Sequence, residues 1–64
     1  SMYFIYNPVE RMWLLGHGPG GCGVPTCIWG PRIQDALPFM HRATAEIIAE
    51  EIGHCEIVYE ECAE

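Results

Sequence analysis

The sequence contains no lysine, and its only strongly basic residues are Arg11, Arg32 and Arg42. Nine acidic residues outweigh these arginines and give a formal net charge of −6. An electrostatic field of this sign repels phosphate groups, so direct binding of DNA or RNA is disfavoured. The acidic surface suits a basic protein partner, although the same charge also serves to keep a small apolar domain in solution.

Long apolar runs are also absent. No stretch approaches the roughly 18 apolar residues that indicate a membrane helix. The N-terminal apolar run is short, lacks a basic start and is interrupted by Asn7-Pro8, so we expect no signal peptide. A cytoplasmic protein without membrane contact is therefore predicted. Ser1, which precedes Met2, is interpreted as a remnant of cloning and is left out of the predicted fold.

The length of 64 residues predicts a single domain over residues 1–64. A chain this short buries only about 60% of its unfolded surface, and such domains usually add disulfides, a metal or a partner subunit. Half of the residues are hydrophobic, which argues against disorder. Part of this apolar surface is expected to lie between subunits, and we predict a homodimer or a higher oligomer.

The clearest pattern lies in residues 37–59. One helical face carries apolar residues at Ala45, Ile48, Ala49 and Ile52. This spacing predicts an amphipathic helix over residues 41–52. Pro38 opposes an earlier start, and His41 is a poor N-cap residue. Gly53 suits the helix exit, where a left-handed conformation is common.

Strand patterns flank this helix. Residues 2–6 and 11–15 predict a hairpin around the turn at residues 7–10, and residues 55–60 alternate as a strand. We therefore predict an α+β fold, a small antiparallel sheet of three or four strands with one helix packed on it, in the order ββ(β)αβ. Both hairpin faces carry large apolar groups, so the loop, the helix or another subunit is expected to cover the second face.

Residues 16–30 contain six glycines and two prolines and are predicted to form a long loop. Ile28 and Trp29 are expected to anchor its far end in the core. The pattern Gly-x-Gly-x-x-Gly fits positions 16, 18 and 21, but the neighbouring prolines forbid the helix that a dinucleotide motif requires. Loop amides remain able to bind an anion, which makes a small nucleotide one candidate ligand. A surface loop or a subunit contact is the alternative.

Cysteines and histidines permit a structural zinc site as an alternative. Its candidate ligands are Cys22, Cys27, His17 and His54. A Cys-x-x-Cys knuckle is missing, Cys55 is expected to face the core, and Cys62 lies in the acidic tail. In a cytoplasmic chain disulfides rarely persist, so free thiols and no cofactor are the favoured interpretation.

Catalytic patterns are weak. Cys22 or Cys27 could act as a nucleophile with His17, but nothing in the sequence orients such a pair. We therefore predict a protein that is not an enzyme. Seven aromatic residues are many for one helix and a few short strands, so some are expected at an interface. The predicted binding residues are Trp13, His17, Gly18, Gly20, Gly21, Trp29 and Arg32.

Several short motifs occur in a recognisable order. They are Tyr3-x-Ile5-Tyr6-Asn7-Pro8, Trp13-Leu14-Leu15-Gly16, Trp29, Asp35-Ala36-x-x-Phe39, the helix ending at Gly53, and Glu56-Ile57-Val58. In this order the chain resembles small accessory proteins of bacteriophages and prophages. His41 stands where the pattern usually has serine or threonine, and the glycine-rich loop is an elaboration. The resemblance implies a protein that antagonises a host antiviral defence, by binding a defence protein or by sequestering its nucleotide signal.

Overall fold

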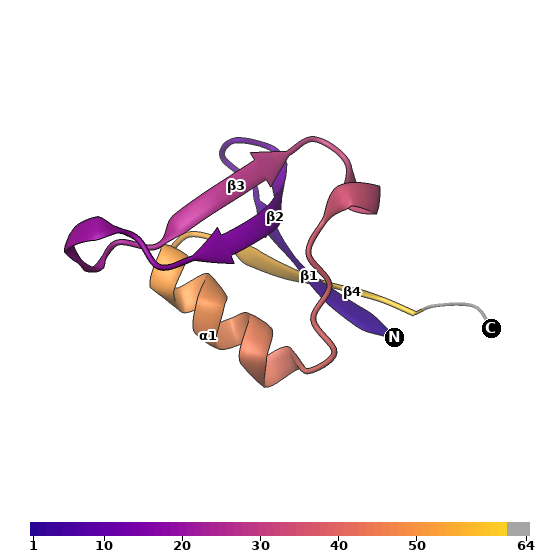
Figure 1. The fold of residues 1–64 in the computed structure, drawn as a ribbon. Coiled ribbons are helices and arrows are strands. Elements are labelled where there is room, and N and C mark those ends of the chain that lie inside the picture. The colour runs from indigo at the N-terminus through magenta and orange to yellow at the C-terminus, as the bar shows by residue number, and fades with distance from the viewer. Residues whose placement is uncertain (62–64) are drawn as a thin grey trace.

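The computed structural model describes residues 1–61 (Figure 1). Its elements are β1 (Met2–Asn7), β2 (Met12–Gly18), β3 (Thr26–Gly30), α1 (Arg42–Ile52) and β4 (Glu56–Glu60), with short 3-10 turns η1 (Gly21–Gly23) and η2 (Ile33–Asp35). The strands form an antiparallel sheet in the order β3-β2-β1-β4. The predicted α+β fold is confirmed, but β3 lies within residues 16–30, which the sequence predicts as a loop.

The turn between β1 and β2 is held by Asn7. Its Oδ1 accepts hydrogen bonds from the backbone N–H groups of Val9 at 3.0 Å and Glu10 at 3.2 Å. An asparagine side chain that mimics backbone in this way is a common turn former, so the predicted hairpin is confirmed. The two strands pair only next to the turn, at Tyr6 with Trp13 and at Asn7 with Met12.

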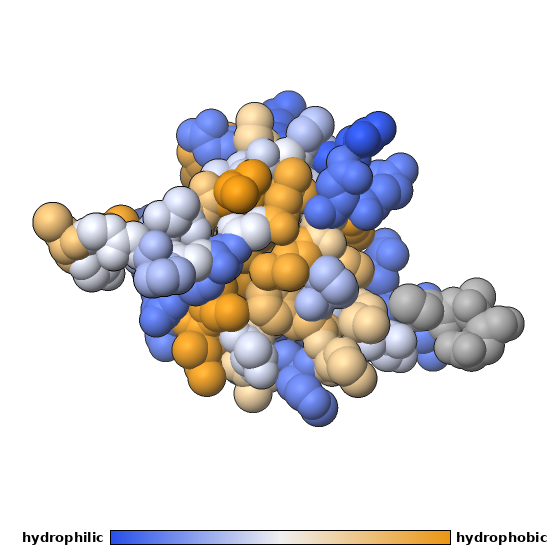
Figure 2. Space-filling model, in the orientation of Figure 1, coloured by the Kyte–Doolittle hydropathy of each residue, from blue (hydrophilic) through white to orange (hydrophobic). Residues whose placement is uncertain are grey.

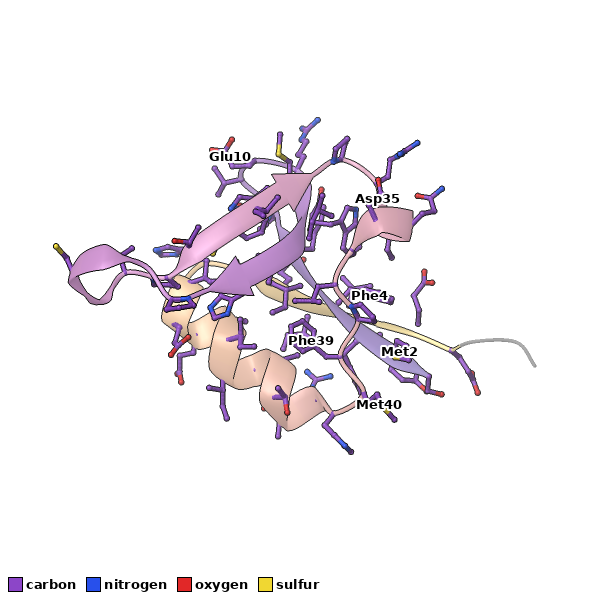
Figure 3. The ribbon with its side chains drawn as sticks, in the orientation of Figure 1. Met2, Phe4, Glu10, Asp35, Phe39 and Met40 are labelled. Carbon is purple, nitrogen blue, oxygen red and sulfur yellow. The ribbon has the colours of Figure 1, made fainter. Side chains whose placement is uncertain are left out.

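Beyond these two pairs, residues 37–39, which precede α1, lie between β1 and β2. Tyr3 and Phe39 exchange two backbone hydrogen bonds, of 2.8 and 2.9 Å, and the N–H of Leu37 donates to the carbonyl of Leu14 at 2.9 Å. In Figure 3 the Phe39 ring lies between α1 and β1. The segment therefore satisfies backbone groups of both strands and carries an aromatic ring into the core.

The core lies between α1 and one face of the sheet. Its buried residues are Ile5, Leu14, Phe39, Ala45 and Ala49. The alanines lie on the predicted apolar stripe of the helix, and their small side chains allow α1 to approach the sheet closely. On the face shown in Figure 2, apolar side chains gather at the centre, between α1 and the β2–β3 hairpin. Within residues 1–61, no helix is long and apolar enough to cross a membrane.

The ends of α1 agree with the sequence in most respects. The helix begins one residue after His41, which makes no side-chain capping hydrogen bond. Arg42 and Glu46 form an ion pair of 2.8 Å across one helical turn. Gly53 has a positive φ of 86°, as expected for a glycine exit, but its ψ of 145° is not that of the left-handed helical conformation. The next residue, His54, also has a positive φ, of 59°.

The prediction of a long loop over residues 16–30 is wrong. β2 continues to Gly18 and β3 starts at Thr26, so that only residues 19–25 connect them. Glycine carries no side chain, so the end of β2 shows no hydrophobic alternation in the sequence. Ile28 is also misplaced by the prediction, because it is 60% exposed. Trp29 packs on the core, and alternation along the strand therefore turns Ile28 to the opposite face.

Candidate functional site

Three aromatic side chains gather on the sheet face that points away from α1. Ile5 and Leu14 face the helix, so the strand alternation turns Phe4, Tyr6 and Trp13 to the other side. The Tyr6 and Trp13 rings lie 4.7 Å apart between centroids, and the Phe4 and Trp13 rings meet edge to face at 6.5 Å. All three side chains are half-buried. We refer to Phe4, Tyr6 and Trp13 as the aromatic cluster.

Residues of β4 lie beside this cluster. The strand register pairs Val58 with Phe4, Glu56 with Tyr6 and Glu60 with Met2, and paired residues of an antiparallel sheet share one face. Val58 therefore extends the cluster, and the carboxylates of Glu56 and Glu60 border it. Because the core and α1 occupy the opposite face, this apolar surface takes no part in the packing of the core.

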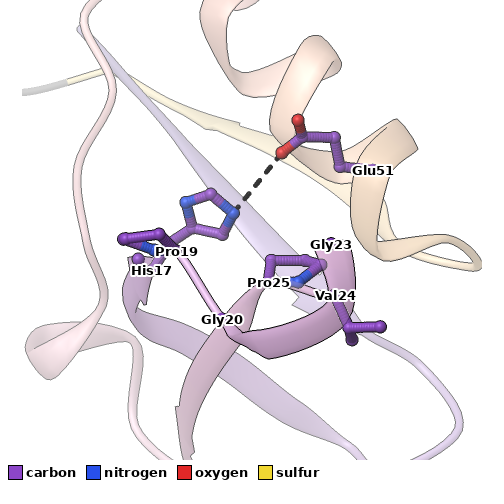
Figure 4. Close-up of a pocket in the computed structure, with 8 residues that line it drawn as sticks. His17, Pro19, Gly20, Gly23, Val24, Pro25 and Glu51 are labelled. Atoms are coloured by element: carbon purple, nitrogen blue, oxygen red, sulfur yellow. Dashed lines mark ion pairs between the residues drawn. The ribbon is translucent and has the colours of Figure 1, made fainter.

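A β-bulge in β2 decides the direction of His17. The register with β3 shifts between Leu14, which pairs with Trp29, and Gly16, which pairs with Ile28. One extra residue in β2 reverses the alternation beyond it. His17 consequently shares the helix side of the sheet with Leu14 rather than pointing away from it. Its Nε2 lies 3.6 Å from the Oε1 of Glu51, in the last turn of α1 (Figure 4).

A pocket of about 570 Å³ opens beside this pair, and Figure 4 shows most of the residues around it. Its lining residues are His17, Gly18, Pro19, Gly20, Gly23, Val24, Pro25 and Glu51. The loop turns tightly because Cys22 and Gly23 have positive φ angles of 58° and 76°. Gly20 is required sterically, since a Cβ there would collide with the carbonyl oxygen of Val24.

The predicted binding residues are distributed over several places. His17, Gly18 and Gly20 line the pocket, and Gly21 begins η1 next to it. Trp13 belongs to the aromatic cluster, at the far end of β2. Trp29 packs against the core from β3. Arg32 comes just after β3, at the end of the β2–β3 hairpin that lies away from the pocket. It pairs with the exposed Asp35 at 3.0 Å, so it does not reach the pocket.

The candidate zinc ligands are not brought together as a set. Within residues 1–61 there is no group of three or more histidine, cysteine, aspartate or glutamate side chains placed to hold a metal. Cys22 is exposed on the loop, whereas His54 lies in a second pocket of about 690 Å³ between α1 and β4. Cys62 lies outside the described residues.

Two thiols pack at the edge of the core. Cys27 and Cys55 are both half-buried against the core cluster, as was expected for Cys55. Burial raises the pKa of Cys27. Burial also raises the pKa of Cys55, with a smaller contribution from the nearby Cys27 thiol. Both side chains therefore stay protonated over the neutral range, which suits packing rather than nucleophilic chemistry.

Sequence reasoning missed Glu51 as a partner of His17. In the sequence, Glu50 and Glu51 form an acidic pair off the apolar stripe, and such a pair indicates a solvated helix face. The Glu51 side chain is indeed 56% exposed, and no sequence signal connects it to His17. The alternation of Phe4 and Tyr6 with Tyr3 and Ile5 did contain a signal for the aromatic cluster, because only one face of the hairpin can meet a single helix.

Comparison with protein families, with curated proteins and with solved structures finds no match to this chain. Its function therefore has to be inferred from the aromatic cluster and from the His17–Glu51 pocket.

Proposed function

We propose that this chain is a non-enzymatic binding protein that docks a basic protein partner on the aromatic cluster. The observation that carries this proposal is the mutual packing of Phe4, Tyr6 and Trp13 outside the core. Rings that hold each other in place lose little conformational freedom on binding, and buried tryptophan and tyrosine residues dominate the energy of protein interfaces.

The charges next to the cluster favour a basic partner. Glu56 and Glu60 share its face, and the chain as a whole carries a net charge of −6. A second copy of the chain would bring the same carboxylates and the same net charge toward each other, which opposes face-to-face pairing. A partner with lysine or arginine around an apolar centre would complement both the apolar rings and the carboxylates of this surface.

The nucleotide alternative has weaker support. The pocket at the glycine-rich loop contains the carboxylate of Glu51 and no arginine, so the phosphates of a nucleotide would meet a negative group there.

Because the chain resembles phage accessory proteins, we further propose that the basic partner is a host defence protein whose action is blocked by the contact.

The decisive experiment measures binding of a synthetic amphipathic peptide of leucine and lysine by titration calorimetry. Trp13→Ala is expected to weaken binding about tenfold or more, because a central tryptophan commonly contributes about 2 kcal/mol or more to an interface. The matched control is Tyr59→Ala, since Tyr59 is an aromatic residue that is 48% exposed on the other face, beside Tyr3. This control should bind as the unmodified chain does.

Two outcomes would contradict the proposal. One is equal binding of the corresponding leucine–glutamate peptide, which would show that binding does not require a basic partner. The other is a dimer, detected by light scattering, that Trp13→Ala converts to a monomer while peptide binding is absent. That result would assign the aromatic cluster to the predicted homodimer instead.

A further inference from the structure

We propose that the His17–Glu51 pocket binds the guanidinium group of an arginine side chain. This is a second binding site, on the helix side of the sheet, and it does not depend on the aromatic cluster. The pocket has two polar side chains, which come from different elements. β2 supplies His17 and the last turn of α1 supplies Glu51.

Both groups offer acceptors to a ligand. The Nε2 atom of His17 is buried and has no hydrogen-bond partner among residues 1–61, which is a costly arrangement for a polar atom. A neutral imidazole can present this nitrogen as an acceptor. Glu51 contributes a carboxylate that accepts hydrogen bonds only. The two acceptors lie 3.6 Å apart. At this spacing each can accept a hydrogen bond from a different N–H group of one guanidinium, which has five donors in a plane.

The charge at this end of the molecule is negative. Glu51 lies in the last turn of α1, where the outward carbonyls carry a partial negative charge, and that turn has no basic residue. Glu50 adds a second carboxylate to the same turn. A cation is therefore stabilised here, whereas an anion would be repelled.

The walls of the pocket select among cations. Apart from His17 and Glu51, the lining consists of glycine, proline and valine residues, which offer no polar side-chain atom. Guanidinium is more weakly hydrated than ammonium and stacks its flat face on apolar groups, so it suits walls made by Pro19 and Pro25 better than a lysine head does. The volume of about 570 Å³ lies in the usual range for ligand pockets.

The pocket is also shaped before any ligand arrives. The two prolines limit the backbone freedom of the loop, and the hydroxyl of Thr26 donates a 3.5 Å hydrogen bond to the carbonyl of Pro19 across it. Gly20 fits against the carbonyl of Val24 with no room for a side chain. These constraints on the loop lower the conformational entropy that binding would otherwise cost.

The test is a titration of the ¹⁵N-labelled chain with Nα-acetyl-arginine amide, followed by NMR. We expect saturable shifts at the amides of Gly18, Gly20 and Gly23 and at the His17 imidazole. Nα-acetyl-citrulline amide has nearly the same shape without the charge, and it should produce no saturable shift. Glu51→Gln is expected to weaken arginine amide binding about fivefold or more, because a charge-assisted hydrogen bond becomes a neutral one.

The matched control is Glu50→Gln, which makes the same change of charge in the same helical turn but outside this pocket. It should change the affinity less than about twofold, as expected for an exposed charge that makes no direct contact. An equal loss in the two variants would overturn the proposal in favour of a general electrostatic field. So would equal responses to the arginine and citrulline amides, or shifts of the same signals by Zn²⁺ but not by arginine amide.

Discussion

His17 faces the helix because β2 contains one residue more than its partner strand requires. The extra residue lies between Leu14 and Gly16, where the register with β3 shifts. Without the bulge, the alternation would turn His17 to the side of the aromatic cluster, away from Glu51. A single extra residue thus turns His17 toward the pocket, and the residues next to His17 in the sequence do not indicate this.

The glycines of the loop differ in how strictly they are required. Gly20→Ala is expected to destabilise the chain by about 1–3 kcal/mol, the usual range for overpacking, because the added Cβ meets the backbone oxygen of Val24. Gly18→Ala is the matched control in the same pocket, since a Cβ there meets nothing within 4 Å. Urea unfolding of both variants measures the difference, and equal stabilities would show that the loop accommodates the methyl group by moving.

At the scale of the element, α1 is stabilised more by its contacts than by its ends. Ala45 and Ala49 are buried against the sheet, whereas His41 at the N-cap makes no capping hydrogen bond. A helix of this length is marginal on its own, so it depends on the apolar stripe that packs on Ile5 and Phe39. The weak start predicted from the sequence is confirmed.

This missing cap offers a gain in stability. His41→Asp is expected to raise the free energy of unfolding by about 1 kcal/mol, because the carboxylate can accept a hydrogen bond from a free N–H of the first turn. The midpoint of thermal unfolding should rise by about 4–8 °C for that gain in a domain of this size. His41→Ala removes the imidazole without adding an acceptor and should show no gain, so equal midpoints of the two variants would refute the capping explanation.

At the scale of the whole molecule, one sheet separates two surfaces. α1 and the buried residues occupy one face together with the His17–Glu51 pocket, and the aromatic cluster lies on the other face. The single helix of residues 1–61 cannot cover both sides of a four-stranded sheet, so the outer rings stay outside the core. The homodimer predicted from the sequence stays a prediction.

The stability of the whole domain should fall in alkaline solution. Burial raises the pKa of Cys27 and Cys55 in the folded state, so each thiol keeps its proton to higher pH than it does in the unfolded chain. The unfolded chain then binds fewer protons than the folded chain, and the free energy of unfolding decreases as the pH rises past the ordinary thiol pKa of about 8.5. Below that pH, the contribution of these thiols is constant.

Urea unfolding at neutral pH and at several alkaline pH values measures this decrease. The variant with Cys27→Ala and Cys55→Ala should be less stable at neutral pH, because it loses two packed side chains, but its stability should depend less on pH. A decrease of the same size in the variant would show that groups other than these two thiols cause the alkaline effect. Replacing the exposed Cys22 by alanine provides the control for the loss of a thiol.

Elements with local signals could be predicted from the amino-acid sequence alone. The stripe of Ala45 and Ala49 placed the helix, Asn7 placed the first turn, and Gly53 placed the helix exit, each through an interaction within a few residues. The fold class followed, because a single amphipathic helix has to pack on a sheet. The candidate site, in contrast, depends on long-range contacts. β3 forms by pairing with β2, the bulge redirects His17, and Glu51 meets it from a distant element, so all three depend on contacts that leave no periodic trace in the sequence.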